Sequence, residues 1–384
     1  MMKTGKFLLA LAGAALFAAM PVQAQVKIGV IGSATGPTAF VGIPQRNTIP
    51  LLPDKVGDTR IEYIFLDDGS DPTASVKAAQ QLISEKHVDA LIGPSGSPNA
   101  MGVLSFMAEA ETPMLAPVGT AAVVLPMDDK KRWVFKTHPN DGVIARRLIA
   151  AMQARKVGTV GFIGLNDPYG ENWYNTFAEQ AQAANIRIVA SERYGRQDTS
   201  VTGQVAKLIA ARPDVVLVAG IAAAAALPHL QLIEAGFKGE IYHTHGSASG
   251  AFIQIGGKAV EGALVVGPML LVIDEIADDV PTRALAHEYV SRYEKMHQQR
   301  PPIFGAGVYD AGLLLANALP QALERAQPGT REFRGALRDA LERTSGMRAS
   351  QGVIDMSAAD HSGFDDRGQV LMTVRDKRFV LVRD

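Results

Sequence analysis

Three hydroxyl side chains follow two short apolar segments in the first third of the chain, and they are the first candidates for chemistry. Ser95 and Ser97 lie in the loop after the apolar run 89–93, and Thr120 follows the run 114–116. Both runs have the length of buried strands, and the segment between them has a helical period. Ligands of open parallel sheets bind at the carboxyl ends of the strands, where loops lead into helix N-termini. The stretch therefore predicts a site for a small polar group, without an obvious base or nucleophile.

The chain carries none of the motifs that would make these hydroxyls catalytic. In the segment 246–250, GSASG, alanine stands where a G-x-S-x-G elbow has its nucleophilic serine. There is no P-loop and no H-E-x-x-H pattern. His243 and His245 would point to opposite faces of a strand, and no cysteine or third ligand stands at a useful spacing. We therefore expect a binding protein and not an enzyme, with neither cofactor nor metal ion.

The first 24 residues have the three parts of a secretory signal peptide. Lys3 and Lys6 form a basic start, residues 7–20 are apolar, and we expect cleavage after Ala24. Loss of these two lysines leaves 36 of the 38 basic residues against 39 acidic ones, a net charge of about −3. This balance argues against a nucleic-acid partner. Because no further stretch approaches the length of a membrane span, and no cysteine could carry a lipid, we expect a free, soluble periplasmic monomer.

At 384 residues the chain is long enough for two domains, and strands alternate with helices in two similar series. The predicted strands are residues 26–31, 60–66, 89–93 and 114–116 in the first series, and 160–164, 187–190, 214–220 and 241–243 in the second. The pattern predicts two α/β lobes with parallel sheets. The segment 282–341 is expected to be mostly helical, and the chain to end in short strands. Pro44, Pro50 and Pro53 argue against a helix after the first strand.

An ordered series of motifs resembles a known family. The signal peptide is followed by KIGVIGSATGP, FLDDGSDP, ALIGPSGS, TPMLAPVGT, NDPYGENW and EGALVVGP. Together they are similar to the periplasmic solute-binding proteins of branched-chain amino acid (Leu/Ile/Val-binding, type I) ABC importers. The resemblance implies two Rossmann-like lobes joined by a three-crossover hinge, which close on a ligand and deliver it to an inner-membrane ABC permease. It also implies a first lobe of residues 25–140 and 269–350, and a second of residues 141–268 and 351–384. A ligand-sensing or regulatory protein for amides or other small solutes is the alternative.

The resemblance also implies the ligand-binding residues. Ser97 and Thr120 take the positions that hold the ligand carboxylate, with Ser95 in the same loop and Val118 offering backbone groups. Hydroxyls and main-chain N–H groups at a helix N-terminus suit a carboxylate on physical grounds as well. Phe40 stands where an aromatic side chain follows the G-P loop, and Tyr169 matches the tyrosine of the second lobe. Phe304 and Tyr309 are two further aromatic candidates, but ligand contact is the less favoured role for either of them.

Two departures from the family pattern concern the ligand's amino group. His245 stands where amino-acid binders carry an acidic residue, and Ile221 stands where they often place a tyrosine. A neutral imidazole cannot replace a carboxylate as the partner of an ammonium, and a protonated one would repel it. We therefore favour an apolar or aromatic carboxylic acid or a keto acid, while an aliphatic amino acid and an amide stay open. The disulfide of some relatives is absent, because Ser70 and Gly96 take its positions.

Three aspartates after the second strand look like a cation site but have a simpler interpretation. Asp67, Asp68 and Asp71 lie in a glycine-containing turn that precedes Pro72. Asp71 followed by a proline is a typical helix start, with a capping side chain and proline at the first helical position. We therefore expect a solvated turn and a helix cap.

Overall fold

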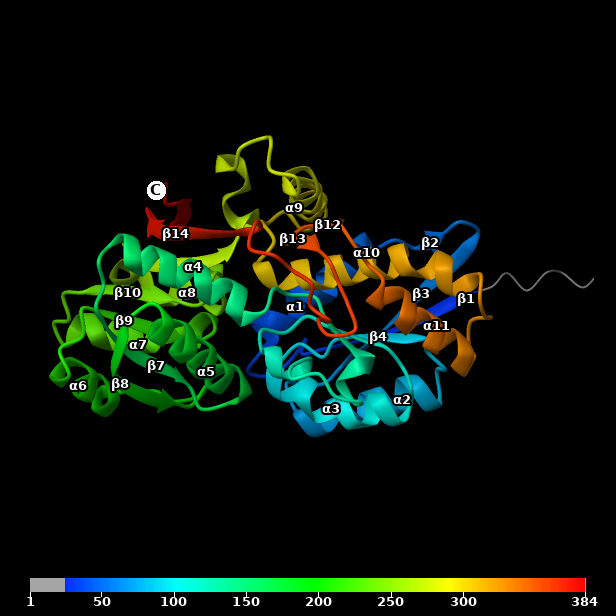
Figure 1. Cartoon of the computed structure of the whole chain (residues 1–384), viewed down its shortest axis with the longest axis horizontal. Helices are drawn as coiled ribbons and strands as arrows, with labels where there is room; N and C mark the ends of the chain where they lie inside the picture. The colour runs from blue at the N-terminus through cyan, green and yellow to red at the C-terminus, as the bar shows by residue number, and fades with distance from the viewer. Residues whose placement is uncertain (1–24, 384) are drawn as a thin grey trace, which may run out of the picture.

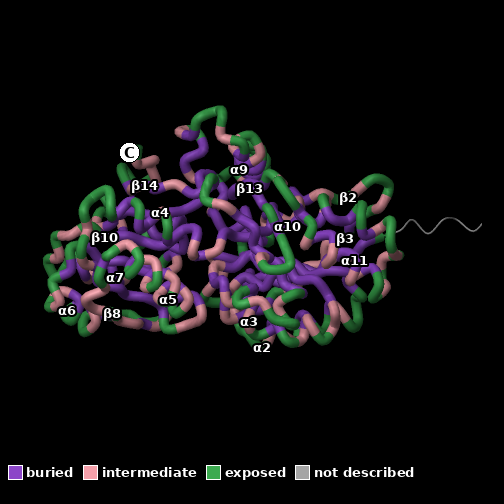
Figure 2. Tube along the Cα trace, in the orientation of Figure 1, coloured by how far each residue is buried: buried purple, intermediate pink, exposed green. Residues whose placement is uncertain are grey.

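The computed structural model describes residues 25–383, which form two α/β lobes side by side (Figure 1). The expected signal peptide, residues 1–24, lies outside the described residues. Each lobe is built on one sheet whose strands are covered by helices. Buried backbone runs through the middle of both lobes and across the junction between them (Figure 2). The sheets position the loops that meet at this junction.

The first lobe is organised around a six-stranded sheet with the order β2-β3-β1-β4-β5-β6. Its strands are β1 (Gln25–Gly32), β2 (Lys55–Val56), β3 (Thr59–Asp67), β4 (Ala90–Ile92), β5 (Met114–Ala116) and β6 (Val134–Lys136). Neighbouring strands are parallel except the short β2, which is antiparallel to β3. The loops after β1, β4, β5 and β6 therefore leave the sheet at one edge, where ligands of such sheets bind.

Helices from two distant parts of the chain cover this sheet. They are α1 (Ala39–Thr48), α2 (Pro72–Ser84), α3 (Ser97–Glu109), α9 (Arg283–His297), α10 (Ile303–Leu323) and α11 (Arg331–Glu342), with the short helices η1 (Ile49–Leu51), η2 (Ala121–Val123) and η3 (Lys131–Trp133). The start of α2 has the predicted chemistry, because the Asp71 side chain accepts a hydrogen bond of 2.7 Å from the Ala74 amide. α10 packs against both α1 and α11, so a late segment completes the first lobe.

The expectation of no helix after β1 is wrong, because α1 includes Pro44. A proline inside a helix removes one hydrogen bond and normally ends it. Here α1 packs along α10, where Gly305 brings the two backbones close: a Cβ at that position would lie 3.1 Å from the Pro44 carbonyl oxygen. Tertiary packing has overridden the local signal, and it does so directly beside the junction between the lobes.

The second lobe is organised around a seven-stranded sheet with the order β15-β14-β11-β10-β9-β7-β8. Its strands are β7 (Thr159–Leu165), β8 (Arg187–Tyr194), β9 (Val215–Ala219), β10 (Glu240–His243), β11 (Leu264–Pro268), β14 (Gln369–Arg375) and β15 (Arg378–Leu381). β14 pairs antiparallel with β11, and β15 pairs antiparallel with β14, so the sheet is mixed. The helices are α4 (Asp141–Ala154), α5 (Pro168–Ala183), α6 (Thr202–Ala210), α7 (Ala222–Glu234) and α8 (Gly250–Gly256), with the short helices η4 (His245–Ser247) and η5 (Gly257–Val260). The short helix η6 (Met269–Glu275) follows β11 and packs against both α9 and β15.

The chain crosses between the lobes after β6, after β11, and between the hairpin β12–β13 (Met347–Ala349 and Gly352–Ile354) and β14. At the third crossing, the chain still contacts the first lobe at His361. The ring of His361 stacks on Phe135 with centroids 4.3 Å apart, and its Nδ1–H donates to the Val134 carbonyl at 2.8 Å. We therefore propose that the first lobe extends past the expected boundary at residue 351.

Helix α10 also corrects the expectation that no further segment approaches a membrane span. Its 21 residues are long and apolar enough by composition to cross a membrane, but 78% of its most apolar window is buried inside the protein. Its buried side chains, which include Leu314 and Leu315, belong to the core of the first lobe. The same apolar composition therefore serves packing against α1 and α11.

Candidate functional site

A small cavity of about 40 Å³ lies between the two lobes and is lined from both. We call it the central cavity. The first lobe contributes Thr38, Val41, Ser95, Gly96, Ser97, Pro117, Val118, Gly119, His138, Ile303 and Phe304, and the second contributes Tyr169, Arg196, Ile221, His245 and Gly246. These residues come from the carboxyl-end loops of β1, β4, β5 and β6 in one sheet, and of β7, β8, β9 and β10 in the other, together with the start of α10. The cavity therefore lies where strand ends of both sheets meet.

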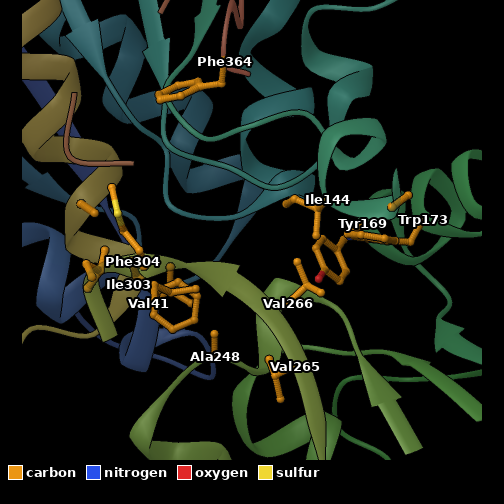
Figure 3. Packing of buried hydrophobic residues seen from close by; sticks show 14 of the residues in the cluster. Val41, Ile144, Tyr169, Trp173, Ala248, Val265, Val266, Ile303, Phe304 and Phe364 are labelled. Carbon is orange, nitrogen blue, oxygen red and sulfur yellow. The ribbon is translucent and has the colours of Figure 1, made fainter. Parts of the chain in front are cut away.

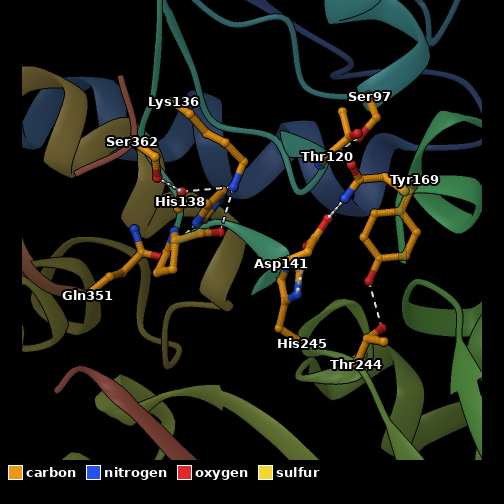
Figure 4. Close-up of polar contacts among 12 residues, drawn as sticks. Ser97, Thr120, Lys136, His138, Asp141, Tyr169, Thr244, His245, Gln351 and Ser362 are labelled. Carbon is orange, nitrogen blue, oxygen red and sulfur yellow. Dashed lines mark hydrogen bonds and ion pairs between the residues drawn. The ribbon is translucent and has the colours of Figure 1, made fainter. Parts of the chain in front are cut away.

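In the first-lobe wall, the Ser97 hydroxyl is the best placed to bind a ligand. Ser97 is the first residue of α3, and its Oγ accepts a hydrogen bond of 3.4 Å from the Thr120 amide (Figure 4). Its own proton remains for a ligand acceptor, beside the positive end of the helix. Ser95 is more committed, because its Oγ accepts from the Ser33 amide at 2.9 Å and donates to Gln45 Oε1 at 2.5 Å.

Two of the predicted ligand contacts do not line the central cavity. Thr120 is fully buried, and its Oγ1 accepts from the Ala122 amide at 3.2 Å, so it caps η2 and positions Ser97 from behind. Phe40 lies outside, packed edge to face on Phe304 with ring centroids 6.0 Å apart. Phe304 does line the cavity, whereas Tyr309 is buried away from it, stacked on Tyr289 at 4.7 Å. The other six predicted contacts line it.

The second-lobe wall approaches the first so closely that a glycine is required between them. A Cβ on Gly119 would lie 2.7 Å from Tyr169 Cε2 and 3.2 Å from His245 Nε2. Tyr169 is held in place, because its hydroxyl forms a 2.7 Å hydrogen bond with Thr244 Oγ1 (Figure 4). Its ring meets that of His245 edge to face, 5.9 Å between centroids. The two lobes are therefore closed against each other in this structure.

Arg196 supplies a cation to the central cavity, and the sequence analysis did not identify it. Its Nε donates to Asp167 Oδ2 at 2.6 Å, while Asp167 Oδ1 accepts from the Tyr169 and Gly170 amides at the start of α5. Arg196 Nη2 is buried and has no hydrogen-bond partner among the described residues. The helix cap thus fixes the guanidinium and leaves one donor group for a ligand.

Arg196 was not predicted because the strand that precedes it is longer than expected. The expected strand ended at Ala190, whereas β8 continues to Tyr194 and pairs with β7 along that length. Arg196 therefore lies just beyond a strand end, where ligand contacts are expected, and not in the middle of a loop. His138 escaped for a related reason, since it follows β6, a strand of only three residues without periodicity.

A buried aspartate, Asp141, lies next to His245 but does not line the central cavity. His245 Nδ1 lies 4.0 Å from Asp141 Oδ1, too far for a hydrogen bond, and neither atom has a hydrogen-bond partner among the described residues. Asn172 donates to the other Asp141 oxygen. Burial raises the pKa of Asp141 to about 7, although Lys136 nearby opposes the shift.

The electrostatics of the junction favour an anion. Among the cavity-lining residues there is no aspartate or glutamate, while Arg196 brings a guanidinium. Burial, together with the charges of His138 and Lys136, lowers the pKa of His245 well below its usual value, so the imidazole is neutral near pH 7. Lys136 is fully buried beside the cavity, and its Nζ donates to the His138 carbonyl at 2.8 Å (Figure 4). Burial lowers the pKa of Lys136 to about 8.

The aspartate turn of the first lobe differs from its expectation at one residue. Asp67 and Asp71 are exposed, as expected, but Asp68 is only 1% exposed. Its carboxylate accepts hydrogen bonds from the side chains of Ser33, Ser75 and Asn99 at 2.7–2.9 Å. Asp68 therefore ties the loop after β1 to α2 and α3, and supports the first-lobe wall.

The fold and the cleft between the lobes define a two-lobed solute-binding protein of the type I class. The chain belongs to the periplasmic binding protein family, since the model of that family matches residues 25–376. An extracellular ligand-binding receptor from Rhodopseudomonas palustris HaA2 has the same fold, with a TM-score of 0.89 and 40% identity. That alignment covers 94% of this chain and 100% of the receptor. The predicted family and fold class are confirmed.

Curated relatives carry the name of the Leu/Ile/Val-binding type. A Leu/Ile/Val-binding protein homolog 6 from Brucella abortus is 32% identical over 145 residues, which is 36% of this chain and 37% of the relative. The match thus spans little more than a third of that protein's length. The Leu/Ile/Val-binding protein BraC3 from Rhizobium johnstonii is 26% identical over 274 residues, 68% of this chain and 72% of the relative. Proteins of this family bind solutes and are not enzymes, as the sequence predicts.

Proposed function

We propose that the chain is the periplasmic substrate-binding component of an ABC transporter for a small carboxylate that lacks an α-ammonium group. One observation carries the proposal: the central cavity presents the Ser97 hydroxyl, the start of α3 and Arg196, but no carboxylate side chain. A carboxylate ligand is matched by these donors, while an ammonium group would be buried without an acidic partner. The closed form then docks on an inner-membrane permease.

The remaining lining describes the body of the solute. Val41, Val118, Ile221, Ile303 and Phe304 are apolar and face the same cavity. A site of this composition binds an apolar or aromatic body and uses a few polar groups for orientation. Ligand contacts from both lobes at once stabilise the closed state relative to the open one, which is how the solute drives closure.

The test is a thermal-shift screen of the mature chain, residues 25–384. The panel contains matched sets: leucine, 4-methylpentanoate and 4-methylpentanamide, then phenylalanine, 3-phenylpropionate and 3-phenylpropanamide. A ligand that binds only the folded state raises the melting temperature by mass action. We expect the acids to raise it, with the amino acids and amides giving smaller shifts. A rise confined to the amino acids would overturn the proposed ligand class, and a rise confined to the amides would support the neutral-solute alternative.

A further inference from the structure

A second hollow between the lobes, with a volume of about 450 Å³, lies next to the central cavity. We call it the side groove. Its apolar walls come from Phe40 and Phe304 in the first lobe, from Ile253 and Phe379 in the second, and from Leu271 in η6. Arg300 and Arg378 are exposed and stand at its rim. The side groove is therefore mostly apolar inside and polar at its edge.

Phe304 belongs to both spaces and forms the wall between them. It lines the central cavity on one side and the side groove on the other, and is 8% exposed. Val41 and Ile303 lie beside it and line the central cavity with it (Figure 3). On the groove side Phe304 meets the edge of Phe40, 6.0 Å between centroids. A single aromatic side chain thus separates two apolar spaces that both lobes enclose.

The volumes of the two spaces differ more than tenfold. The central cavity of about 40 Å³ has room for only a few water molecules, which each need roughly 10–15 Å³ by the same measure. Pockets for organic ligands usually measure about 300–1,000 Å³. The side groove, at about 450 Å³, supplies that missing volume, and it begins at the wall of the anion-binding cavity.

We infer that the solute is an elongated carboxylate whose apolar tail passes Phe304 into the side groove. Its carboxylate lies at Ser97 and Arg196, and its tail packs against Phe40, Ile253 and Phe379. This inference rests on the proposed function, since it places the tail relative to the carboxylate site. It also gives Phe40 a role in ligand contact through the groove, although Phe40 does not line the central cavity.

The test is calorimetric titration of the mature chain with ω-phenylalkanoates of increasing length. The series runs from benzoate through phenylacetate, 3-phenylpropionate and 4-phenylbutyrate to 5-phenylvalerate. Burial of each added methylene in an apolar groove increases affinity about fourfold, at about 0.8 kcal/mol per CH₂. We therefore expect the dissociation constant to fall by a factor of about four per methylene over part of the series. Affinity that is flat or declines from benzoate onward would overturn the inference.

Two variants test whether the tail lies in the side groove. Ala251 and Gln254 on α8 line the groove but not the central cavity, so Ala251→Trp and Gln254→Trp fill the groove alone. Ile255→Trp on the same helix is the matched control, because Ile255 is 55% exposed and outside the groove lining. We expect both groove variants to weaken 5-phenylvalerate at least tenfold and to leave benzoate nearly unchanged. The control should behave as wild type with both acids.

The outcomes separate this inference from the proposed function. If no acid of the series binds, the carboxylate site is refuted and the inference with it. If benzoate binds and the longer acids bind no more tightly, the carboxylate site stands and the tail placement is overturned. Equal loss of benzoate and 5-phenylvalerate in both folded groove variants would also overturn it, since the groove would then act on the whole site. The melting temperature of each variant shows whether it is folded.

Discussion

At the scale of single residues, we expect Arg196 to influence the choice of ligand more than any hydroxyl does. The Asp167 carboxylate holds its Nε, and both Asp167 oxygens are engaged, one by Arg196 and one by the start of α5. Asp167 offsets part of the charge but does not line the central cavity. The guanidinium side chain is 22% exposed, so water screens it only partly. It therefore acts on whatever charge the solute carries.

The first prediction is that Arg196→Gln weakens binding of the carboxylate found in the thermal-shift screen at least tenfold. A hydrogen bond to a charged group contributes about 1.5–3 kcal/mol, which corresponds to a factor of roughly ten to a hundred. Arg146→Gln is the control, because Arg146 carries the same charge on the exposed side of α4 in the same lobe. Calorimetric titration measures both. Wild-type affinity in a folded Arg196→Gln protein would remove Arg196 from the site.

At the scale of secondary-structure elements, two buried histidines join α7 to β10. His229 Nε2–H donates to the Ala259 carbonyl at 2.9 Å, which leaves its Nδ1 to accept from His243 Nε2–H at 2.9 Å. His243 Nδ1 then accepts from the Ser247 hydroxyl at 3.1 Å, in the loop that carries His245. The chain of hydrogen bonds cannot form if both rings are protonated, and the burial of each ring disfavours its charged form. It links the core of the second lobe to the site.

The second prediction is that stability falls as the pH drops from 7.5 to 5. Burial lowers the pKa of His229 to about 4 and that of His243 well below its usual value. In the unfolded chain both rings take up protons below about pH 6.5, so protonation favours unfolding between that pH and the folded-state pKa values. Asp310 works in the opposite direction, since burial raises its pKa to about 6 and its destabilising charge is neutralised at low pH. Asp141 adds to this opposing effect.

The measurement is the melting temperature against pH for wild type and His229→Gln. The unfolded variant takes up one proton fewer than the unfolded wild type. The free energy of unfolding therefore falls less steeply with decreasing pH, by about 1.4 kcal/mol per pH unit at most, and the melting temperature follows it. His287→Gln, at an exposed position of α9, is the control and should keep the wild-type slope. An unchanged slope in His229→Gln would show that the histidine pair does not govern acid stability.

The secondary structure could be predicted where local signals were strong. β9 and the start of α2 are such cases, one through an apolar run and the other through Asp71 and Pro72. The helix α1 could not be predicted, because packing on α10 overcomes Pro44. The same limit applies to the site: Ser97 and Tyr169 follow recognisable strands, whereas Arg196 depends on the last residues of β8. The side groove joins segments far apart in the sequence and has no local signal.

At the scale of the whole molecule, we expect the two lobes to close on a carboxylate that is held from both sides. Ser97 and Arg196 come from different lobes, and Gly119 lets Tyr169 approach the first lobe. An alanine at position 119 would place its Cβ 2.7 Å from the Tyr169 ring. This contact exists between the lobes, so the substitution opposes closure without disturbing the core of either lobe.

The most direct test of ligand-driven closure is small-angle scattering of the mature chain with and without the acid that gives the largest thermal shift. We expect the acid to reduce the radius of gyration of the wild type. We also expect Gly119→Ala to bind the acid at least tenfold more weakly and to keep the larger radius. Gly203→Ala, where no atom lies within 4 Å of the added Cβ, should behave as wild type. Tight binding of the acid with no change in radius, and with equal affinity in Gly119→Ala, would show that the lobes do not close on the ligand.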